Sequence, residues 1–315
     1  MNAWVLGLVS ISVSMQLQAG VTEFGAGLDQ SVWRLTSDTQ IECRLEHPIP
    51  NWGTGAFVSR AGRKINLDFE LKGKRPQAQT QTVSLGIMPP VWRPGIAGRE
   101  VSQLRFYQQF DGLVEGQTAW TMLDELEGGR MPTFQYRDWY RQNRAVRVSL
   151  SSVNFRVKYQ AFIDCLSGLL PYSFNDIAFS VLTYDKNSDQ LSIPSKRRLA
   201  MISEFIKADK SIDVVVIDAY SDSYGGRWPN LKLSEKRADA IKKVFVDLGI
   251  DPGKISVEGH GEKQHVASNE TEQGRAKNRR VVISMGRHGE ISRRPRQPDI
   301  KKSASALFFD PAIRP

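Results

Sequence analysis

Two side chains with complementary chemistry stand a short distance apart in the C-terminal part of the chain. Asp222 lies in a polar, glycine-containing loop, and Arg237 lies in the helical segment that follows. A carboxylate can receive an ammonium group, and a guanidinium can bind a carboxylate through two parallel hydrogen bonds. The pair therefore suits a ligand that carries both an ammonium and a carboxylate group. The alternative is a structural salt bridge between Asp222 and Arg237, and residue type alone leaves both interpretations open.

The helix that carries Arg237 is predicted to span residues 233–248. Ser234 suits the N-cap, because its hydroxyl can accept a hydrogen bond from a free backbone N–H of the first turn. Gly249 suits the end of the helix. An apolar face is predicted from the spacing of Ile241, Val244, Phe245 and Leu248. Arg237 would then oppose the helix dipole in the first turn, so an anion is expected beside it, either Asp222 or a carboxylate of the ligand.

The surrounding residues resemble the OmpA-like peptidoglycan-binding domain, over residues 177–285. The resemblance rests on a series of residues in the family's order and spacing. The series is Asp222, Gly225, Asn230, Leu233, Ser234, Arg237, Ala238, Gly259, Gly261, Glu262, Asn269, Gly274, Arg275, Asn278, Arg279, Arg280 and Val281. The chain departs from the family just before the aspartate, where the usual Gly-His-Thr reads Ala219-Tyr220-Ser221. This departure puts the geometry of the loop before Asp222 in doubt.

The resemblance implies a ligand and a role for each site residue. Asp222 and Arg237 would hold the diaminopimelate of the peptidoglycan stem peptide, which offers an ammonium and a carboxylate at its free end. Asn230 and Leu233 would support these two residues: Asn230 as a polar neighbour, and Leu233 as an apolar side chain that lines the site. The remaining two candidates, Arg279 and Arg280, would either add positive field to the site or be solvated charges at the start of the last strand.

No catalytic motif is present in the sequence. His260 lies in a glycine-rich turn without a serine or cysteine nucleophile motif beside it, and we expect a turn residue with no role in chemistry. Phosphate-loop, dinucleotide and metalloprotease signatures are missing as well. The protein is therefore expected to be a binding protein, with no enzymatic activity, no cofactor and no metal site.

Composition and the first residues predict an exported protein. The chain has 315 residues, 40% of them hydrophobic and 24% charged, which is enough for about two domains. Residues 3–13 are almost wholly apolar and are followed by small residues, so residues 1–20 are predicted to be a signal peptide. The alternatives are a wrong start codon or a buried N-terminal strand. Export to the periplasm would exclude nucleic acid as the partner, despite a net charge of +9.

The two cysteines, Cys43 and Cys165, are expected to form one disulfide in an exported protein. Closing a loop of this length would stabilise the fold by about 4–5 kcal/mol in the chain-entropy model. The alternative is two unpaired buried thiols. Neither cysteine has a histidine or a second cysteine at metal-ligand spacing.

Alternating residues predict an antiparallel β-rich domain over residues 21–170. The clearest strand is 64–71, where Ile65, Leu67, Phe69 and Leu71 share one face. Further strands are expected at 55–59, 81–85, 103–107 and 146–150. Helices are expected at 118–127 and 155–170, with the domain boundary just after the second of them.

Strands and helices alternate in the second domain, residues 171–286. This order predicts an α/β sandwich of the βαβαβ type, and therefore an α+β two-domain protein. Residues 212–217 are nearly continuously apolar and should form a central strand buried on both faces. Ser195 is expected to cap a helix that runs to Lys207. Other strands are expected at 177–182, 254–258 and 279–285, and a short helix at 272–277. Residues 287–315 form a basic, proline-rich tail that is expected to be disordered or bound to a partner.

The whole architecture is similar to that of the MotY family of periplasmic flagellar motor proteins. A membrane barrel would need more alternating strands, a lipoprotein would need a cysteine after the leader, and a stator subunit would need a membrane-spanning helix. The resemblance implies that the N-terminal domain joins a basal-body ring with a MotX-like partner and recruits stator subunits, while the C-terminal domain binds peptidoglycan. The alternative is a general envelope-anchoring protein without a role in motility.

Overall fold

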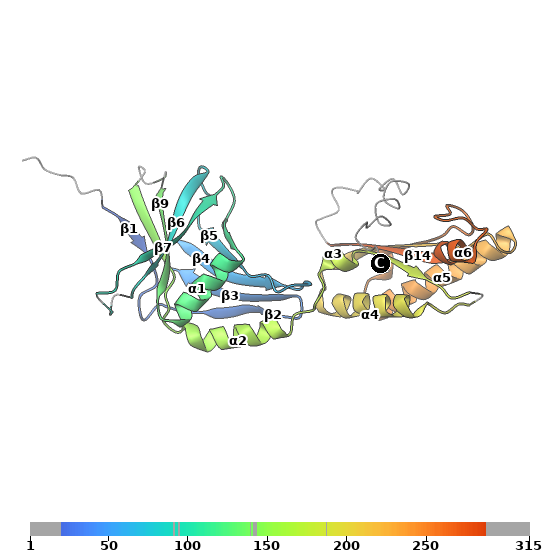
Figure 1. The fold of residues 1–315 in the computed structure, drawn as a ribbon, viewed down its shortest axis with the longest axis horizontal. Helices are drawn as coiled ribbons and strands as arrows, with labels where there is room; N and C mark the ends of the chain where they lie inside the picture. Colours follow the sequence, from blue (N-terminus) through green and yellow to red (C-terminus); the bar gives the residue numbers. More distant parts are fainter. Residues whose placement is uncertain are drawn as a thin grey trace, which may run out of the picture. The chain divides into compact units, whose positions relative to one another are not determined.

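A computed structural model describes residues 20–287, apart from residues 91, 94, 139, 141–143 and 187. Residues 1–19 of the predicted signal peptide and residues 288–315 of the basic tail therefore lie outside the described residues, whereas Arg287 belongs to the last strand. The chain divides into two compact units (Figure 1). The first contains Cys43–Ser59, Asn66–Leu166 and the described residues before Thr39. The second contains the described residues from Ser167 onward together with Thr39–Glu42 and Arg60–Ile65, two short segments that the sequence analysis assigned to the first domain.

The first unit is built from two five-stranded sheets. One has the order β1 (Thr22–Phe24), β10 (Arg144–Ser149), β9 (Met131–Asp138), β6 (Gln81–Met88), β7 (Arg99–Phe106). The other has the order β2 (Arg34–Asp38), β3 (Glu42–Ile49), β4 (Gly53–Arg60), β5 (Asp68–Gly73), β8 (Gly112–Glu115). β1 pairs in parallel with β10, whereas β10, β9, β6 and β7 pair antiparallel. The prediction of an antiparallel β-rich domain is confirmed.

Aromatic side chains fill the core of the first unit. Phe57 of β4 packs on Phe69 of β5 with ring centroids 4.7 Å apart, and Phe69 stacks on Phe134 of β9 at 5.7 Å. All three are fully buried. Because Phe69 and Phe134 come from different sheets, the two sheets share one core, and each aromatic pair adds about 0.5–1.5 kcal/mol beyond its buried area.

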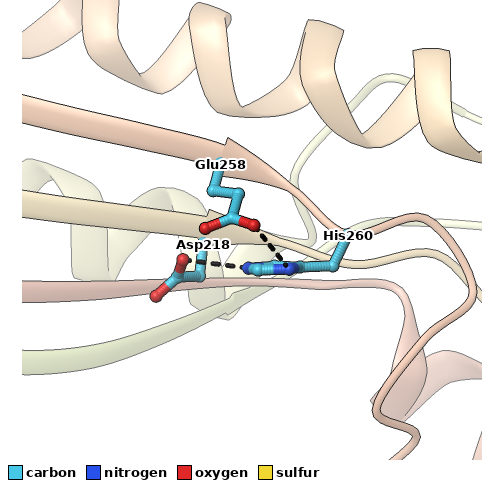
Figure 2. Close-up of side chains that lie close together, drawn as sticks. All are labelled: Asp218, Glu258 and His260. Carbon is cyan, nitrogen blue, oxygen red and sulfur yellow. Dashed lines mark hydrogen bonds and ion pairs between the residues drawn. The ribbon is translucent and has the colours of Figure 1, made fainter.

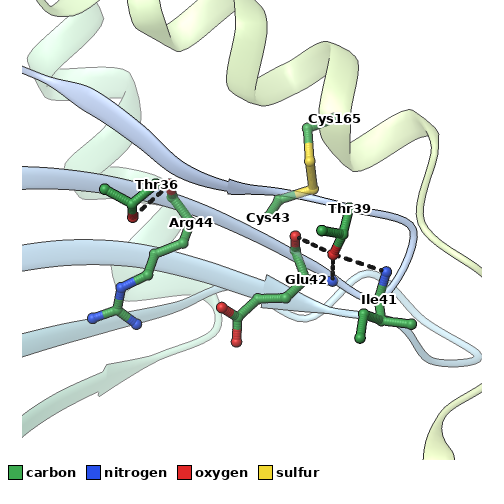
Figure 3. Close-up of a disulfide and its surroundings, with 7 residues drawn as sticks. All are labelled: Thr36, Thr39, Ile41, Glu42, Cys43, Arg44 and Cys165. Atoms are coloured by element: carbon green, nitrogen blue, oxygen red, sulfur yellow. Dashed lines mark hydrogen bonds between the residues drawn. A yellow bond between two sulfur atoms is a disulfide. The ribbon is translucent and has the colours of Figure 1, made fainter. Parts of the chain in front are cut away.

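The predicted disulfide is present between Cys43 of β3 and Cys165 of α2 (Phe155–Ser167) (Figure 3). The two Cα atoms are 6.0 Å apart, and both side chains are buried. The bond ties the beginning of a strand to the last turns of the helix that closes the unit. The other helix of this unit, α1, spans Gln117–Glu127, close to the predicted 118–127.

The prediction of a strand at 64–71 is partly wrong. β5 begins at Asp68, and its alternation buries Phe69 and Leu71 as expected; Leu67, just before the strand, is buried as well. Ile65 is instead 59% exposed. It lies in the irregular stretch 65–67 between the bends at 61–64 and the strand, so the alternation of β5 does not apply to it.

The second unit is a four-stranded sheet with helices packed on it. The order is β11 (Phe179–Thr183), β14 (Arg280–Arg287), β12 (Ile212–Ala219), β13 (Ile255–Gly259). β12 and β13 are parallel, and β14 is antiparallel to both β11 and β12. The helical layer is formed chiefly by α4 (Ile193–Ala208) and α5 (Arg227–Asp247), with the short α3 (Phe174–Ile177) and α6 (Glu272–Asn278) beside them. The predicted α/β sandwich is confirmed.

The central strand β12 is buried on one face only, which corrects the expectation for residues 212–217. Val215 and Ile217 are fully buried in the same core cluster as Ile241 and Phe245 of α5. Val216, which points to the opposite face, is only half-buried. The reason is that α4 and α5 pack against the face that carries Val215 and Ile217. Successive side chains of a strand point to opposite faces of the sheet, so Val216 points away from these helices. Within the described residues, no helix is both long enough and apolar enough to span a membrane.

The helix α4 of the second unit begins earlier in the chain than expected. Its N-cap is Ser192, whose hydroxyl accepts a hydrogen bond from the backbone N–H of Ser195. Ser195 itself lies inside the helix, and its hydroxyl accepts from the backbone N–H of Thr183 in β11 at 2.7 Å. The predicted cap is therefore wrong: Pro194 occupies the first turn, where its missing N–H costs nothing, and this moves the start of the helix upstream.

Candidate functional site in the C-terminal unit

A polar pocket of about 360 Å³ opens in the second unit beside the N-terminal half of α5. It is lined by Ser188, Asp189, Ser221, Asp222, Tyr224, Asn230, Leu233, Arg237 and Arg279. Five of the six site residues proposed from the sequence are in this lining: Asp222, Asn230, Leu233, Arg237 and Arg279. The sixth, Arg280, is not. Its guanidinium stacks over the Tyr220 ring at 3.8 Å, and its Nη2 donates to the backbone carbonyl of Gln264.

Three elements position the lining residues. Asp222 lies in the loop that leaves β12, and Arg279 immediately precedes β14, the neighbouring strand. α5 contributes Asn230, Leu233 and Arg237, whose spacing of three and four residues places them on one side of the helix. The loop and the strand start are therefore placed opposite a single helix face.

The predicted start of this helix is wrong. α5 begins at Arg227 with Gly226 at the N-cap, and Ser234 lies inside the helix. The Ser234 hydroxyl donates to the carbonyl of Leu231 and accepts from the backbone N–H of Gly261 at 2.9 Å, so it ties the helix to the turn after β13. Arg237 is consequently well inside the helix, and the helix dipole does not explain the need for an anion beside it.

Arg237 is buried with two of its nitrogens unpaired. Only 3% of its surface is exposed, and its guanidinium lies over the Tyr184 ring at 4.2 Å. Nη2 donates to the backbone carbonyl of Ser188 at 2.8 Å, whereas Nε and Nη1 have no hydrogen-bond partner in the described part of the chain. Burial lowers the pKa of Arg237, but a guanidinium remains charged at neutral pH. A buried donor without a partner costs about 1–3 kcal/mol, and more when it is charged.

Asp222 pairs with a different arginine from the one expected. Its Oδ2 accepts from Nη1 of Arg279 at 2.9 Å, and its Oδ1 accepts from the backbone N–H of Tyr224 at 3.1 Å. Arg279 also donates from Nη2 to Oε1 of Glu272 at 3.0 Å. The salt bridge considered between Asp222 and Arg237 is thus replaced by a pair between the partly buried Asp222 and the buried Arg279. Arg237 is left available to the pocket.

Asn230 holds the loop against the helix. Its side-chain amide donates to the backbone carbonyl of Asp222 at 3.2 Å and to Oε2 of Glu262 at 3.1 Å. Gly225, which lies between Asp222 and Asn230 in the chain, has a φ of 108°, a backbone conformation that residues with a side chain rarely adopt. The loop can therefore fold back over Asn230 because a glycine stands at this point.

Several pocket residues were missed in the sequence analysis. Ser188 and Asp189 come from the connection between β11 and α4, and Tyr184 at its start supplies the ring beneath Arg237. Asp189 also pairs with Nζ of Lys236 at 2.5 Å, and this pairing lowers the pKa of the Asp189 carboxyl. No motif marks these residues, because they reach the pocket through a loop whose course depends on the packing of α4.

The fold and the pocket define a class of protein. The strand-rich first unit and the helix-covered sheet of the second belong to a two-domain protein with an OmpA-like C-terminal domain, since residues 183–279 match the OmpA family. Residues 24–171 match the MotY N-terminal domain. The chain belongs to the MotY family. Sodium-type flagellar protein MotY of Vibrio parahaemolyticus is 46% identical to it over 290 residues, which is 91% of this chain and 99% of that protein.

Other relatives match the C-terminal part. Outer-membrane lipoprotein YfiB of Pseudomonas aeruginosa is 38% identical over 104 residues, 33% of this chain and 61% of that protein. Among solved structures, the peptidoglycan-associated lipoprotein of Burkholderia pseudomallei covers 34% of this chain and 89% of its own, with 23% identity and a TM-score of 0.31.

Proposed function

We propose that the pocket binds the diaminopimelate of the peptidoglycan stem peptide. The observation that supports this most strongly is the buried guanidinium of Arg237, which lines the pocket with two unpaired nitrogens. A carboxylate of the ligand would pair with this cation. Because the guanidinium is buried away from water, the charge-assisted hydrogen bonds between the two groups would be strong. Asp222 would receive the ammonium group of the same ligand, with Arg279 and Tyr224 holding the aspartate in place. Leu233 would contact the aliphatic part.

We propose further that the protein is a periplasmic component of the flagellar motor. The N-terminal unit would join a ring at the basal body with a MotX-like partner and would help to recruit stator subunits, while the C-terminal unit holds the ring to the wall. Support comes from membership of the MotY family over nearly the whole chain. Torque on a stator must be resisted by a fixed support, and many weak wall contacts in one ring would combine into a strong attachment.

The wall-binding proposal is tested by sedimentation with purified sacculi. The wild-type chain should sediment with them, and Arg237→Ala should weaken this binding by about tenfold or more, as expected for a charge-assisted contact of about 1.5–3 kcal/mol. Arg227→Ala is the matched control, because it removes the same charge from an exposed position on the same helix. Unchanged sedimentation of a folded Arg237→Ala variant would reject the site. Release of soluble muropeptides by the wild type would show an enzymatic activity that this proposal does not include.

The motor proposal is tested separately, in cells. A tagged copy should be found at the flagellated pole, and a deletion strain should swim poorly. Normal swimming by the deletion strain would favour the alternative, a general envelope-anchoring protein without a role in motility.

A further inference from the structure

A second cluster of polar side chains lies on the sheet face opposite the helices. Asp218 is in β12 and Glu258 is its register partner in the parallel strand β13, so both carboxylates project from the same face. His260 follows two residues after Glu258 and lies on that face as well (Figure 2). These residues are not part of the pocket around Arg237.

The imidazole of His260 stands between the two carboxylates. Its Nε2 donates to Oδ1 of Asp218 across 3.0 Å, and its Nδ1 is 3.5 Å from Oε1 of Glu258. One ligand atom from each residue lies within 4.8 Å of the others. The His260 side chain is only 14% exposed and stacks on Tyr220 with ring centroids 4.7 Å apart. The ring is therefore held in place, while the exposed Glu258 is free to rotate toward a bound ion.

In the described part of the chain, no lysine or arginine forms an ion pair with either carboxylate of the cluster. Like charges directly opposite each other on neighbouring strands are destabilising. Within the described residues, the ion-pair contacts of Asp218 and Glu258 go to His260 only. Arg280 is near, but its guanidinium stacks on Tyr220 and its hydrogen bond goes to Gln264. A cation at this place would remove the repulsion between the two strands.

We propose that Asp218, Glu258 and His260 form a binding site for a divalent transition metal ion of the Zn²⁺ class. An imidazole with two carboxylates is a ligand set that suits Zn²⁺, whereas Mg²⁺ and Ca²⁺ prefer oxygen ligands alone. With Zn–N and Zn–O bonds of about 2.0–2.2 Å, neighbouring ligand atoms on one ion are about 3.0–3.5 Å apart. The distance of 3.0 Å between Nε2 of His260 and Oδ1 of Asp218 already fits this value, and one ligand atom from each of the three residues lies within 4.8 Å of the others, so a rotation of the exposed Glu258 side chain would complete the ligand set. Water would complete the coordination. This site was not expected from the sequence, because its ligands come from two strands that are distant in the chain.

The position of the cluster gives the ion a structural role. β12 continues from Asp218 into the loop that carries Asp222, and the chain after His260 leads to Glu262, which holds Asn230. A metal ion would therefore join the bases of both loops that shape the pocket. The metal site does not depend on the identity of the ligand bound in that pocket.

The site is tested by calorimetric titration of Zn²⁺ into the full chain after treatment with a chelator. The starting protein carries His265→Gln and His288→Gln, so that these two imidazoles do not contribute. One ion should bind per chain and should raise the midpoint of thermal unfolding. His260→Gln should weaken binding at least about tenfold, and the isosteric Asp218→Asn should do the same. Binding should also weaken as the pH falls, because the ligands must lose their protons.

Two outcomes would overturn the proposal. One is loss of Zn²⁺ binding in the His265→Gln, His288→Gln protein itself, which would show that the ion binds only through His265 or His288. The other is unchanged affinity in both His260→Gln and Asp218→Asn. If His260→Gln fails to fold, as judged by circular dichroism in the absence of metal, Asp218→Asn decides the question alone.

Discussion

His47 in the first unit and Arg237 in the second are both almost fully buried, but their polar atoms have different surroundings. His47 stacks on Trp33 at 4.5 Å, its Nδ1 donates to the carbonyl of Val32 at 3.0 Å, and its Nε2 accepts from the backbone N–H of Ser151 at 3.4 Å. Both ring nitrogens are satisfied in the neutral form. Arg237 has one partner for Nη2 and none among the described residues for Nε and Nη1.

The contrast separates a buried polar group that stabilises the fold from one that is kept for a ligand. A satisfied group such as His47 is part of a filled core. An unsatisfied, charged group such as Arg237 lowers the stability of the fold. Such groups are typical of binding sites, where a ligand supplies the missing partner. We therefore expect changes in the first unit to lower stability without changing wall binding, and replacement of Arg237 by an apolar residue to abolish wall binding without lowering stability.

The largest stability effect should come from the disulfide of the first unit. Replacing Cys43 and Cys165 by serine should lower the free energy of unfolding by about 4–5 kcal/mol, because the bond closes a loop with a sequence separation of 122 residues. Unfolding in guanidinium, followed by fluorescence, measures the change. The C-terminal unit should still bind sacculi. A simultaneous loss of wall binding by protein whose second unit remains folded would contradict the separation of roles.

Acid should weaken the first unit through His47. Burial lowers the pKa of His47 from 6.5 to about 4, so the unfolded chain binds an extra proton between these values. The stabilisation that depends on a neutral His47 is fully present above pH 6.5. It is lost as the pH falls toward 4, which lowers the free energy of unfolding by about 3 kcal/mol in total. Unfolding measured from pH 7 to 4 should show this slope, and His47→Gln should remove it while His265→Gln retains it. Equal slopes in wild type and His47→Gln would refute the role assigned to His47.

A smaller effect with the opposite sign is expected at Arg237. Arg237→Met replaces a buried cation with an apolar side chain of similar length, and it should raise the free energy of unfolding of the second unit by about 1–2 kcal/mol. Binding to sacculi should be lost in the same variant. Thermal unfolding and sedimentation of one preparation give both values. A variant that is less stable by several kcal/mol would show that Arg237 has a structural role instead.

The sequence predicted the pocket more accurately than the helix that carries it. Asn230, Leu233 and Arg237 share a helix face wherever the helix begins, so their common position follows from spacing alone. The start of the helix does not, because Ser234 is a good cap by residue type but in the fold bonds to Gly261 instead. Such a contact depends on how β13 packs against α5, which local sequence does not encode.

Contacts between distant residues account for the other differences. Asp222 pairs with Arg279 and not with Arg237, because β14 lies next to β12 in the sheet although it is the last strand in the chain. Ile65 follows the alternating pattern of its neighbours but is exposed, since β5 begins only at Asp68. Spacing along the chain identifies which residues are near a site. The sheet order decides which of them touch.

Recognition of diaminopimelate by Arg237 is measured by calorimetric titration of the protein with a soluble muropeptide whose stem ends in diaminopimelate. The same muropeptide with lysine in that position lacks the second carboxylate and serves as the control. We expect saturable binding of the first ligand, binding at least about tenfold weaker for the lysine form, and a similar loss for Arg237→Met with the diaminopimelate ligand. Equal affinity for the two ligands, or unchanged affinity in Arg237→Met, would contradict this expectation.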